Sequence, residues 1–258
     1  MNTRLHHRSS RHAVRQRGLT LVEIMVAMAI GLFLLGGLLT IVQNTRRTYG
    51  SQNQLAQLQD NERLAMTLLG DVIQAAGYYP DPTINTVTGA LPVVAGAYPL
   101  GPFPTAGQSI TGQTFVTVAG DRIIVRFLTA TNDGMINCTG SSNTTGANAM
   151  YTNAFQVATV GGVSYLTCAL NNAAAVPLVS GVQSLKILYG VKTDFTADNG
   201  AVDSYLKASE MTAANWNNVI SVRVTLTFLN PLAGQPNQPA TIAFQRVVSV
   251  MNRAGVKT

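Results

Sequence analysis

The stretch RGLTLVEIMVAMAIGLFLLGGLLTIV, from Arg17 to Val42, decides the fold of this chain. Between Leu19 and Val42 the only ionisable side chain is Glu23. As a helix these residues extend roughly 36 Å, at about 1.5 Å per residue, which is long enough to cross the hydrocarbon layer of a bilayer. The stretch therefore predicts a transmembrane helix over residues 19–42.

The single carboxylate in this stretch needs an explanation. A carboxylate costs about 2.5–3.5 kcal/mol at the centre of a spanning helix and less near an interface, where it reaches headgroups or water. Glu23 lies close to the start of the run, so the helix can still insert. Two interpretations stay open at this point: Glu23 only snorkels to the interface, or it is kept for a partner that it meets after leaving lipid, such as a free α-amine on a neighbouring helix.

The charge of the chain is concentrated before the apolar run. The formal net charge is +6, from 17 Lys and Arg against 11 Asp and Glu, and residues 1–18 hold five arginines without an acid. The rest of the chain therefore carries 12 basic and 11 acidic side chains, a net charge of +1. Basic flanks resist translocation, so we expect residues 1–18 in the cytoplasm and the bulk of the chain outside it. The run is too long for the core of an ordinary secretory signal, and no small-x-small cleavage site follows it.

Histidine is confined to the same basic tail. His6, His7 and His12 are the only histidines, so Ser-His and Cys-His nucleophile pairs and His-ligated metals are excluded from the rest of the chain. A hydrolase built only from carboxylates, lysines and hydroxyls is the remaining enzymatic alternative. We predict no enzymatic activity and no cofactor.

The start of the apolar run resembles a known targeting signal. Arg17-Gly18, then Leu19-Thr20-Leu21-Val22-Glu23, then about twenty apolar residues, is similar to the class III signal of type IV pilins and type II secretion pseudopilins. The resemblance implies that a prepilin peptidase cuts between Gly18 and Leu19 and that the new amino group of Leu19 is N-methylated. It also implies that Glu23 pairs with the mature N-terminus of an adjacent subunit, where opposite charges in a low dielectric penalise a wrong register. Leu19 stands where the family usually has Phe, and Thr40 lies near a proline of many major pilins, which suggests a minor subunit.

The helix is expected to continue beyond the membrane. Apolar residues from Leu55 to Ala76 recur at helical spacing, which predicts an amphipathic continuation over residues 43–77. Gly77 can adopt the left-handed conformation that ends a helix, and Pro80 and Pro82 oppose its continuation. The face that we expect to be buried comprises Leu55, Leu58, Ala65, Leu69, Val72 and Ala76.

Residues 78–258 are expected to form a β-rich head. Six prolines among glycines predict an irregular connection over residues 80–113. The period of hydrophobicity then becomes two, most clearly in Val222–Phe228. We therefore predict an α+β, pilin-like fold in which one antiparallel sheet packs on the amphipathic half of the helix. The predicted strands are Asp121–Leu128, Phe155–Val160, Val163–Leu170, Val182–Tyr189, Val219–Phe228 and Thr241–Met251.

The head also resembles one branch of the pilins. The pattern from Cys138 through TNAFQVATV, YLTCAL and LVSGVQSLKILYGV to YLKASEMTAANWNNVISVRVTLTF is similar to PilW minor pilins. This implies a low-abundance subunit that primes type IV pilus assembly at or near the tip and supports twitching motility and adhesion. The implied partners are other minor and major pilins, the prepilin peptidase and the inner-membrane assembly platform, with no direct nucleic-acid contact.

The implied location is the inner membrane of a Gram-negative bacterium, with a single membrane pass and a periplasmic head, and afterwards the extracellular pilus. A minor pseudopilin of a type II secretion system is the alternative within the same class. A membrane-anchored adhesin or a DNA-uptake receptor is the alternative from another class.

Cys138 and Cys168 are the only cysteines. In an oxidising periplasm they are expected to form a disulfide, and the alternative is a pair of buried free thiols. The chain has no close C-x-x-C pair of the kind used in redox catalysis.

Other polar and aromatic groups carry weaker signals. Asp194, Asp198 and Asp203 could offer oxygen ligands to calcium, but their spacing misses the EF-hand pattern and fits a solvated loop better. The small polar residues 139–149 indicate a mobile surface loop or, as the alternative, a recognition edge.

Three aromatic residues could line an adhesive groove or belong to the core, and the core is the simpler expectation. They are Tyr189, Tyr205 and Trp216. Lys186, Lys192 and Lys207 form no basic run, which argues against direct DNA binding.

Overall fold

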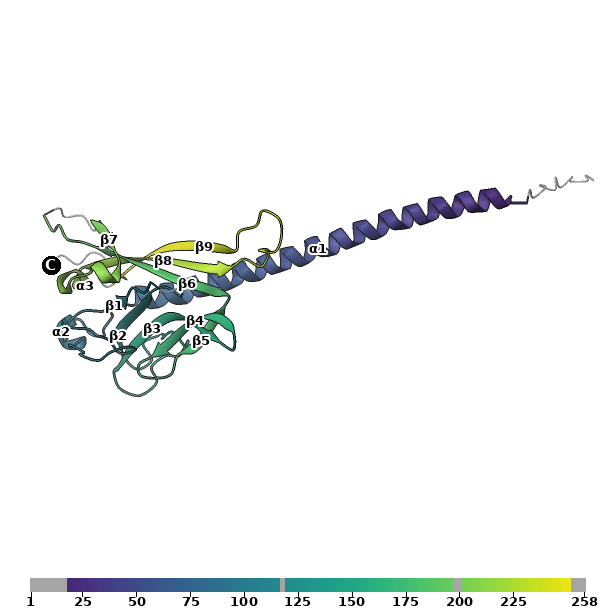
Figure 1. The fold of residues 1–258 in the computed structure, drawn as a ribbon. Coiled ribbons are helices and arrows are strands. Elements are labelled where there is room, and N and C mark those ends of the chain that lie inside the picture. Colours follow the sequence, from purple (N-terminus) through teal and green to yellow (C-terminus); the bar gives the residue numbers. More distant parts are fainter. Residues whose placement is uncertain (1–17, 117–118, 197–200, 252–258) are drawn as a thin grey trace, which may run out of the picture. The chain divides into compact units, whose positions relative to one another are not determined.

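The computed structural model of the chain describes residues 18–116, 119–196 and 201–251 (Figure 1). The basic tail with its arginines and histidines lies outside the described residues, and so does Asp198. The chain divides into two compact units, Met1–Gly50 and Ser51–Thr258, which are described separately.

The first unit contains the N-terminal part of helix α1 (Leu21–Gln74). Gly18, Leu19 and Thr20 precede the helix, which therefore begins two residues later than the predicted span. The large apolar side chains from Leu19 to Val42 are all exposed, and an 18-residue window of α1 reaches a mean hydropathy of 2.5. By length and composition α1 is one helix that could cross a membrane.

In the second unit, α1 presents a buried face to the head. Leu58, Ala65, Leu69, Val72 and Ala76 are buried as predicted, and Leu55 is half-buried. Met66 and Ile73, next to them on the helix, are buried as well. The helix ends at Gln74, followed by a turn in which Gly77 has a φ of 79°, the left-handed conformation expected there.

The head has two antiparallel sheets where one was expected. The first has the order β1-β2-β3-β4-β5 and the second the order β7-β6-β8-β9. One hydrophobic cluster comprises residues of α1 and of both sheets, including Leu69, Phe155 and Leu226. The strands of the first sheet are β1 (Ile110–Gln113), β2 (Arg122–Thr129), β3 (Ala149–Val160), β4 (Val163–Leu170) and β5 (Val176–Ser180). Those of the second are β6 (Val182–Val191), β7 (Ser204–Leu206), β8 (Val219–Leu229) and β9 (Thr241–Ser249).

The chain passes between the sheets immediately before β2. The N–H of Asp121 donates to Leu185 O over 2.6 Å, and the N–H of Leu185 donates to Ala119 O over 3.1 Å. Gly120 forms a parallel bridge with Leu185 of β6. Residues 119–121 therefore bond to the second sheet, while β2, directly after them, bonds to the first.

The expected irregular connection is shorter than predicted, because Ile110–Gln113 is strand β1. The rest of it contains one short helix, α2 (Val87–Ala90), and covers part of the outer face of the first sheet. Phe103 of this segment packs in a small buried cluster with Ile124, Ala154 and Ala169. A 3-10 turn (Ala208–Glu210) and helix α3 (Ala213–Asn217) precede β8.

Candidate functional site

The predicted cleavage site lies directly ahead of α1. Gly18 and Leu19 are exposed and outside the helix, and the side chain of Leu19 is 71% exposed. Thr20 Oγ1 accepts a hydrogen bond from the N–H of Glu23 over 3.3 Å, and Thr20 O accepts one from Ile24 over 3.2 Å. Thr20 therefore caps the helix, and the peptide bond between Gly18 and Leu19 lies outside the first hydrogen-bonded turn.

The cap at Thr20 was missed by the sequence reasoning. Thr20 and Glu23 form the T-x-x-E spacing that precedes an apolar run at helix starts, so a signal was present. The Glu23 side chain is exposed in the first turn of α1. Among the described residues its carboxylate has no hydrogen-bonding or ionic partner, so it is available to a group from another molecule.

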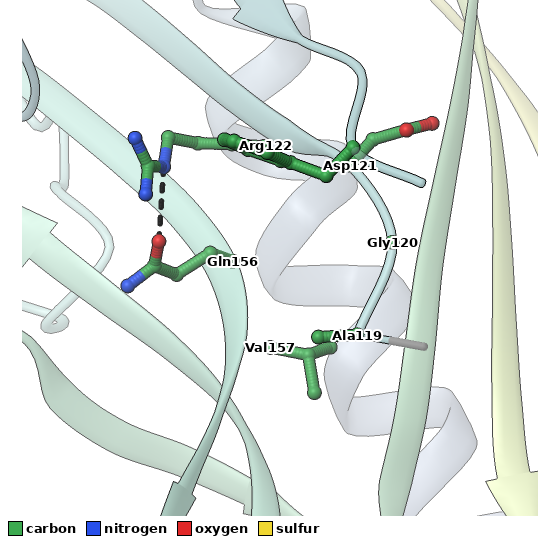
Figure 2. A pocket seen from close by; sticks show the side chains of 7 residues that line it. Ala119, Gly120, Asp121, Arg122, Gln156 and Val157 are labelled. Atoms are coloured by element: carbon green, nitrogen blue, oxygen red, sulfur yellow. Dashed lines mark hydrogen bonds between the residues drawn. The ribbon is translucent and has the colours of Figure 1, made fainter. Parts of the chain in front are cut away.

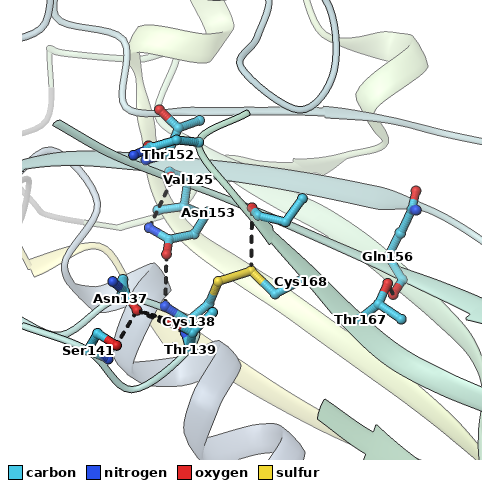
Figure 3. The surroundings of a disulfide bond; sticks show 12 residues. Val125, Asn137, Cys138, Thr139, Ser141, Thr152, Asn153, Gln156, Thr167 and Cys168 are labelled. Carbon is cyan, nitrogen blue, oxygen red and sulfur yellow. Dashed lines mark hydrogen bonds between the residues drawn. A yellow bond between two sulfur atoms is a disulfide. The ribbon is translucent and has the colours of Figure 1, made fainter. Parts of the chain in front are cut away.

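The two cysteines form the expected disulfide (Figure 3). Cys138 and Cys168 are both buried, and the bond joins the loop before β3 to strand β4. The N–H of Cys138 donates to Asn153 Oδ1 over 2.8 Å, and Asn153 Nδ2 donates to Val125 O over 3.5 Å. The buried amide of Asn153 thus ties the disulfide loop to the centre of the first sheet.

The loop that contains Cys138 is held by polar side chains. Asp133 accepts hydrogen bonds from Thr129 Oγ1 and from the N–H of Ala130, both over 2.7 Å. Burial alone would raise the pKa of Asp133, but these hydrogen bonds outweigh it and lower that pKa below its usual value. The buried Asn143 donates to Thr129 O and Ala147 O. Most side chains of residues 139–149 are exposed, so the loop offers a polar surface on a fixed base.

Arg126 holds the segment that covers the first sheet. The residue is 1% exposed, and its guanidinium donates to Gln108 O over 2.8 Å, to Pro92 O over 2.7 Å and to Leu91 O over 3.2 Å. The guanidinium carbon lies 4.1 Å from the centre of the Phe103 ring. Burial lowers the pKa of Arg126 to about 10. Sequence reasoning missed this residue, because strand alternation does not show what covers each face of a strand.

A cavity of about 210 Å³ lies where the chain passes from the second sheet into β2 of the first (Figure 2). Arg122 Nε donates to Gln156 Oε1 over 2.9 Å, and its guanidinium lies 3.6 Å from the centre of the Tyr98 ring. The buried Asp121 points away from that guanidinium, and its Oδ2 accepts a hydrogen bond from the N–H of Ile187 over 2.8 Å. These groups join the two sheets and form no pair of nucleophile and base.

Two of the aspartates considered for calcium, Asp194 and Asp203, accept hydrogen bonds from nearby residues of the same segment. Asp203 Oδ2 accepts hydrogen bonds from the N–H groups of Thr193 and Asp194 over 2.6 and 2.7 Å. Asp194 Oδ1 accepts from the N–H and the hydroxyl of Thr196. Across residues 18–116, 119–196 and 201–251, no three acidic, histidine or cysteine side chains are grouped so that they could hold a metal ion.

The aromatic residues are largely core. Tyr189 is 1% exposed and meets Trp216 edge to face, with ring centres 4.7 Å apart. Tyr205 packs under Arg223, whose guanidinium carbon lies 3.9 Å from the ring centre. These contacts support the core interpretation for Tyr189 and Trp216.

Two families of known proteins match parts of this chain. Residues 14–39 match the prokaryotic N-terminal methylation motif, and residues 141–250 match the family described as type IV pilus-assembly protein W, PilW. By these two matches the chain is similar to type IV pilins at its N-terminus and PilW-like over residues 141–250. They confirm the resemblance seen in the sequence.

A type IV-like pilin from Thermus thermophilus is similar in structure, with 14% identity and a TM-score of 0.35. The similarity covers 76% of this chain and 97% of that protein. No curated protein matches the chain in sequence.

Proposed function

We propose that this PilW-like chain is a minor pilin that primes type IV pilus assembly and is incorporated at or near the filament tip, where it supports twitching motility and adhesion. The observation that carries the proposal is the presence in one chain of the methylation motif at residues 14–39 and the PilW region at residues 141–250. The implied partners are other pilins, the prepilin peptidase and the inner-membrane assembly platform. The implied path runs from the inner membrane of a Gram-negative cell, with a periplasmic head, to the pilus.

Processing is proposed at the exposed bond between Gly18 and Leu19. The cap at Thr20 lies on the mature side of this bond, so cleavage leaves the first turn of α1 intact. Methylation is then proposed at the new amino group of Leu19. Under this proposal residues 1–18 are a cytoplasmic leader, residues 19–42 span the membrane, residues 43–77 continue the helix and residues 78–258 form the head.

Mass spectrometry of the mature N-terminus tests this step. We expect a chain that begins at methylated Leu19. Recovery of the cellular protein with its arginine-rich tail intact would refute the proposal. Deletion then separates the two systems of this class: loss of pili and twitching supports a minor pilin, and loss of exoprotein secretion with normal pili assigns the chain to a type II secretion system.

Glu23 is proposed to pair with the α-amine of a neighbouring subunit. Glu23→Val should insert and be processed normally, because the cap uses the backbone N–H of residue 23 and not its carboxylate. Incorporation into pili should fall about ten-fold or more, since the neighbour's amine would be buried without its partner. Immunoblots of sheared pili and of membranes measure the two quantities.

Asp60→Asn is the matched control, because it removes another exposed carboxylate from α1. It should leave incorporation within about two-fold of the parent. Normal incorporation of Glu23→Val would show that the charge pair is not used by this subunit.

A further inference from the structure

Strand β9 is the outer strand of the second sheet, and one of its edges pairs with no other strand of the described residues (Figure 1). We call this the free edge. Its pairing with β8 continues at both ends through hydrogen bonds from Asn230 N to Ala240 O and from Val250 N to Ile220 O. In an antiparallel ladder, hydrogen-bonded pairs alternate with non-bonded pairs. The even-numbered residues of β9 therefore bond to β8, and the odd-numbered residues direct their backbone N–H and C=O groups away from the sheet.

These outward backbone groups have no partner among the described residues. The five residues that carry them are all exposed, and none of their side chains is charged. They are Thr241, Ala243, Gln245, Val247 and Ser249. A strand edge of this kind can accept a further strand through main-chain hydrogen bonds.

The other edge strands of the described sheets have features that hinder the addition of a further strand and that β9 lacks. Strands β1 and β7 have four and three residues. Strand β5 has five residues, contains Pro177 and pairs with β4 through a register shift. Strand β9 has nine residues, no proline and an uninterrupted register with β8. Natural proteins use short edges, prolines, bulges and charges against strand addition, and of these devices β9 carries only one charge, that of Arg246.

One charge lies beside the free edge. Arg246 pairs with Val224 on the face of the sheet that carries the core, and its Nη1 reaches Met66 O of α1 over 3.5 Å. Its guanidinium lies close to Gly70, where an added Cβ would be 3.6 Å from Nη1. Arg246 has no carboxylate partner in the described part of the chain, so an added strand meets an unneutralised positive charge on its inner side.

A second copy of this chain does not supply the matching charge. The edge strands β1, β5, β7 and β9 contain no Asp or Glu. Two antiparallel β9 strands centred on Gln245 would place Arg246 of each copy opposite Phe244 of the other, so that both guanidinium groups lie on one face at neighbouring pairs. The charge beside the edge therefore favours a different chain.

We propose that the free edge of β9 takes up an extended strand of another pilin subunit, with uncharged side chains on the outer face and a carboxylate beside Arg246. This inference rests on the proposed function as a pilin and adds a contact surface to it. The added strand pairs with the outward groups of the five odd-numbered residues, and its acid neutralises the arginine.

Site-specific photocrosslinking of the full chain tests this contact. A benzoylphenylalanine placed at Gln245 in the cells that make this protein should give one crosslinked product with a different processed pilin, identified by mass spectrometry. Ala243→Pro removes one outward N–H without touching a bond to β8, and should lower the yield at least about five-fold. Arg246→Glu should lower it by a similar factor through charge repulsion.

Thr225→Lys is the matched control. Thr225 pairs with Gln245 and lies on the same face of the sheet as Gln245, but it belongs to the internal strand β8. It should leave the yield within about two-fold. Each variant is compared at parental protein level and trypsin resistance, and Arg246→Glu provides the test if Ala243→Pro fails that comparison.

Four results would overturn the proposal: no product in piliated cells, a product between two copies of this chain, a product with a protein that is not a pilin, or unchanged yields in both edge variants. Such a result in cells where Leu19 is methylated and pili depend on the chain would refute the β9 contact and leave the proposed function standing.

Discussion

Arg126 has a large structural role, and the sequence around it does not reveal that role. Within the described residues its buried guanidinium has no carboxylate partner, and it contacts backbone carbonyl oxygens and the Phe103 ring. Such a group stabilises a fold only while its hydrogen bonds are complete, because each unsatisfied buried partner costs about 1–3 kcal/mol. Arg126 therefore adds three hydrogen bonds to the apolar packing of Phe103 that holds residues 91–108 on the first sheet.

Arg126→Met should destabilise the head by about 3 kcal/mol. The change keeps much of the side-chain volume but removes the only donor that the structure gives to Pro92 O and Gln108 O. Urea unfolding of the full chain in detergent measures the change. Arg63→Met, at an exposed position of α1, should change the free energy of unfolding by less than about 0.5 kcal/mol. Equal effects of the two substitutions would contradict the role given to Arg126.

The sequence predicts single residues well where a local rule applies. Gly77 ends the helix turn because a glycine before prolines is a local signal, and Leu69 is buried because helical spacing is local too. Arg126 could not be predicted, because its burial depends on a segment some thirty residues earlier that folds over it. Strand periodicity reports which side of a strand a residue faces, and not what covers that side.

Among the elements, residues 119–121 are the segment in which the chain passes from the second sheet to β2 of the first. Gly120 has a φ of 84°, and a Cβ at this position would collide with the carbonyl oxygen of Leu185. Only glycine allows the backbone to approach β6 this closely and then turn into the other sheet. The transition between the sheets therefore depends on this position.

Gly120→Ala should destabilise the head by about 3 kcal/mol or more, through backbone strain and the collision with Leu185. Gly134→Ala is the matched control, because Gly134 has a φ of 82° but nothing within 4 Å of an added Cβ. It should cost about 1–2 kcal/mol from backbone strain alone. Thermal melts of both variants give the difference, and equal melting temperatures would show that the close approach to β6 is unimportant.

Long strands with strict alternation are predicted closely. Strand β8 begins at Val219 as expected and ends at Leu229, one residue later. Strands β1, β5 and β7 were missed because they are short, and β5 also contains Pro177, which argues against a strand. The first half of β3 was missed because Thr152 and Asn153 look like loop residues, although Asn153 is buried and hydrogen-bonded.

For the head as a whole, the disulfide is the one covalent constraint. It closes a loop across 30 positions between Cys138 and Cys168. On the chain-entropy model, a loop of this size stabilises the folded state by about 3–4 kcal/mol. The pairing was predictable because the chain has only two cysteines, and the partner of each is then fixed.

Cys138→Ala combined with Cys168→Ala should lower the free energy of unfolding by about 3–4 kcal/mol. Denaturant unfolding of the oxidised parent and of the double variant measures the loss. The parent under strong reductant should behave like the double variant. A loss below about 1 kcal/mol would mean that the loop contributes little beyond what Asp133, Asn143 and Asn153 already provide.

The two-sheet arrangement of the head could not be predicted from periodicity. Each predicted strand was compatible with either sheet, because alternation identifies a buried face and leaves its neighbours open. The backbone hydrogen bonds of Asp121 and Leu185 join residues more than sixty positions apart and fix where the chain passes between the sheets. The same limit applies to the β9 edge, because periodicity does not show that no other strand of the described residues pairs with it.

The hydrophobic cluster that unites α1 with both sheets has a consequence for cooperativity. Leu58 to Ala76 supply apolar side chains to a core that also contains Phe155 of one sheet and Leu226 of the other. Neither sheet can lose its packing on the helix without exposing part of the other's interior. A force applied to residues 58–76 of α1 is therefore transmitted to both sheets through one shared set of apolar contacts.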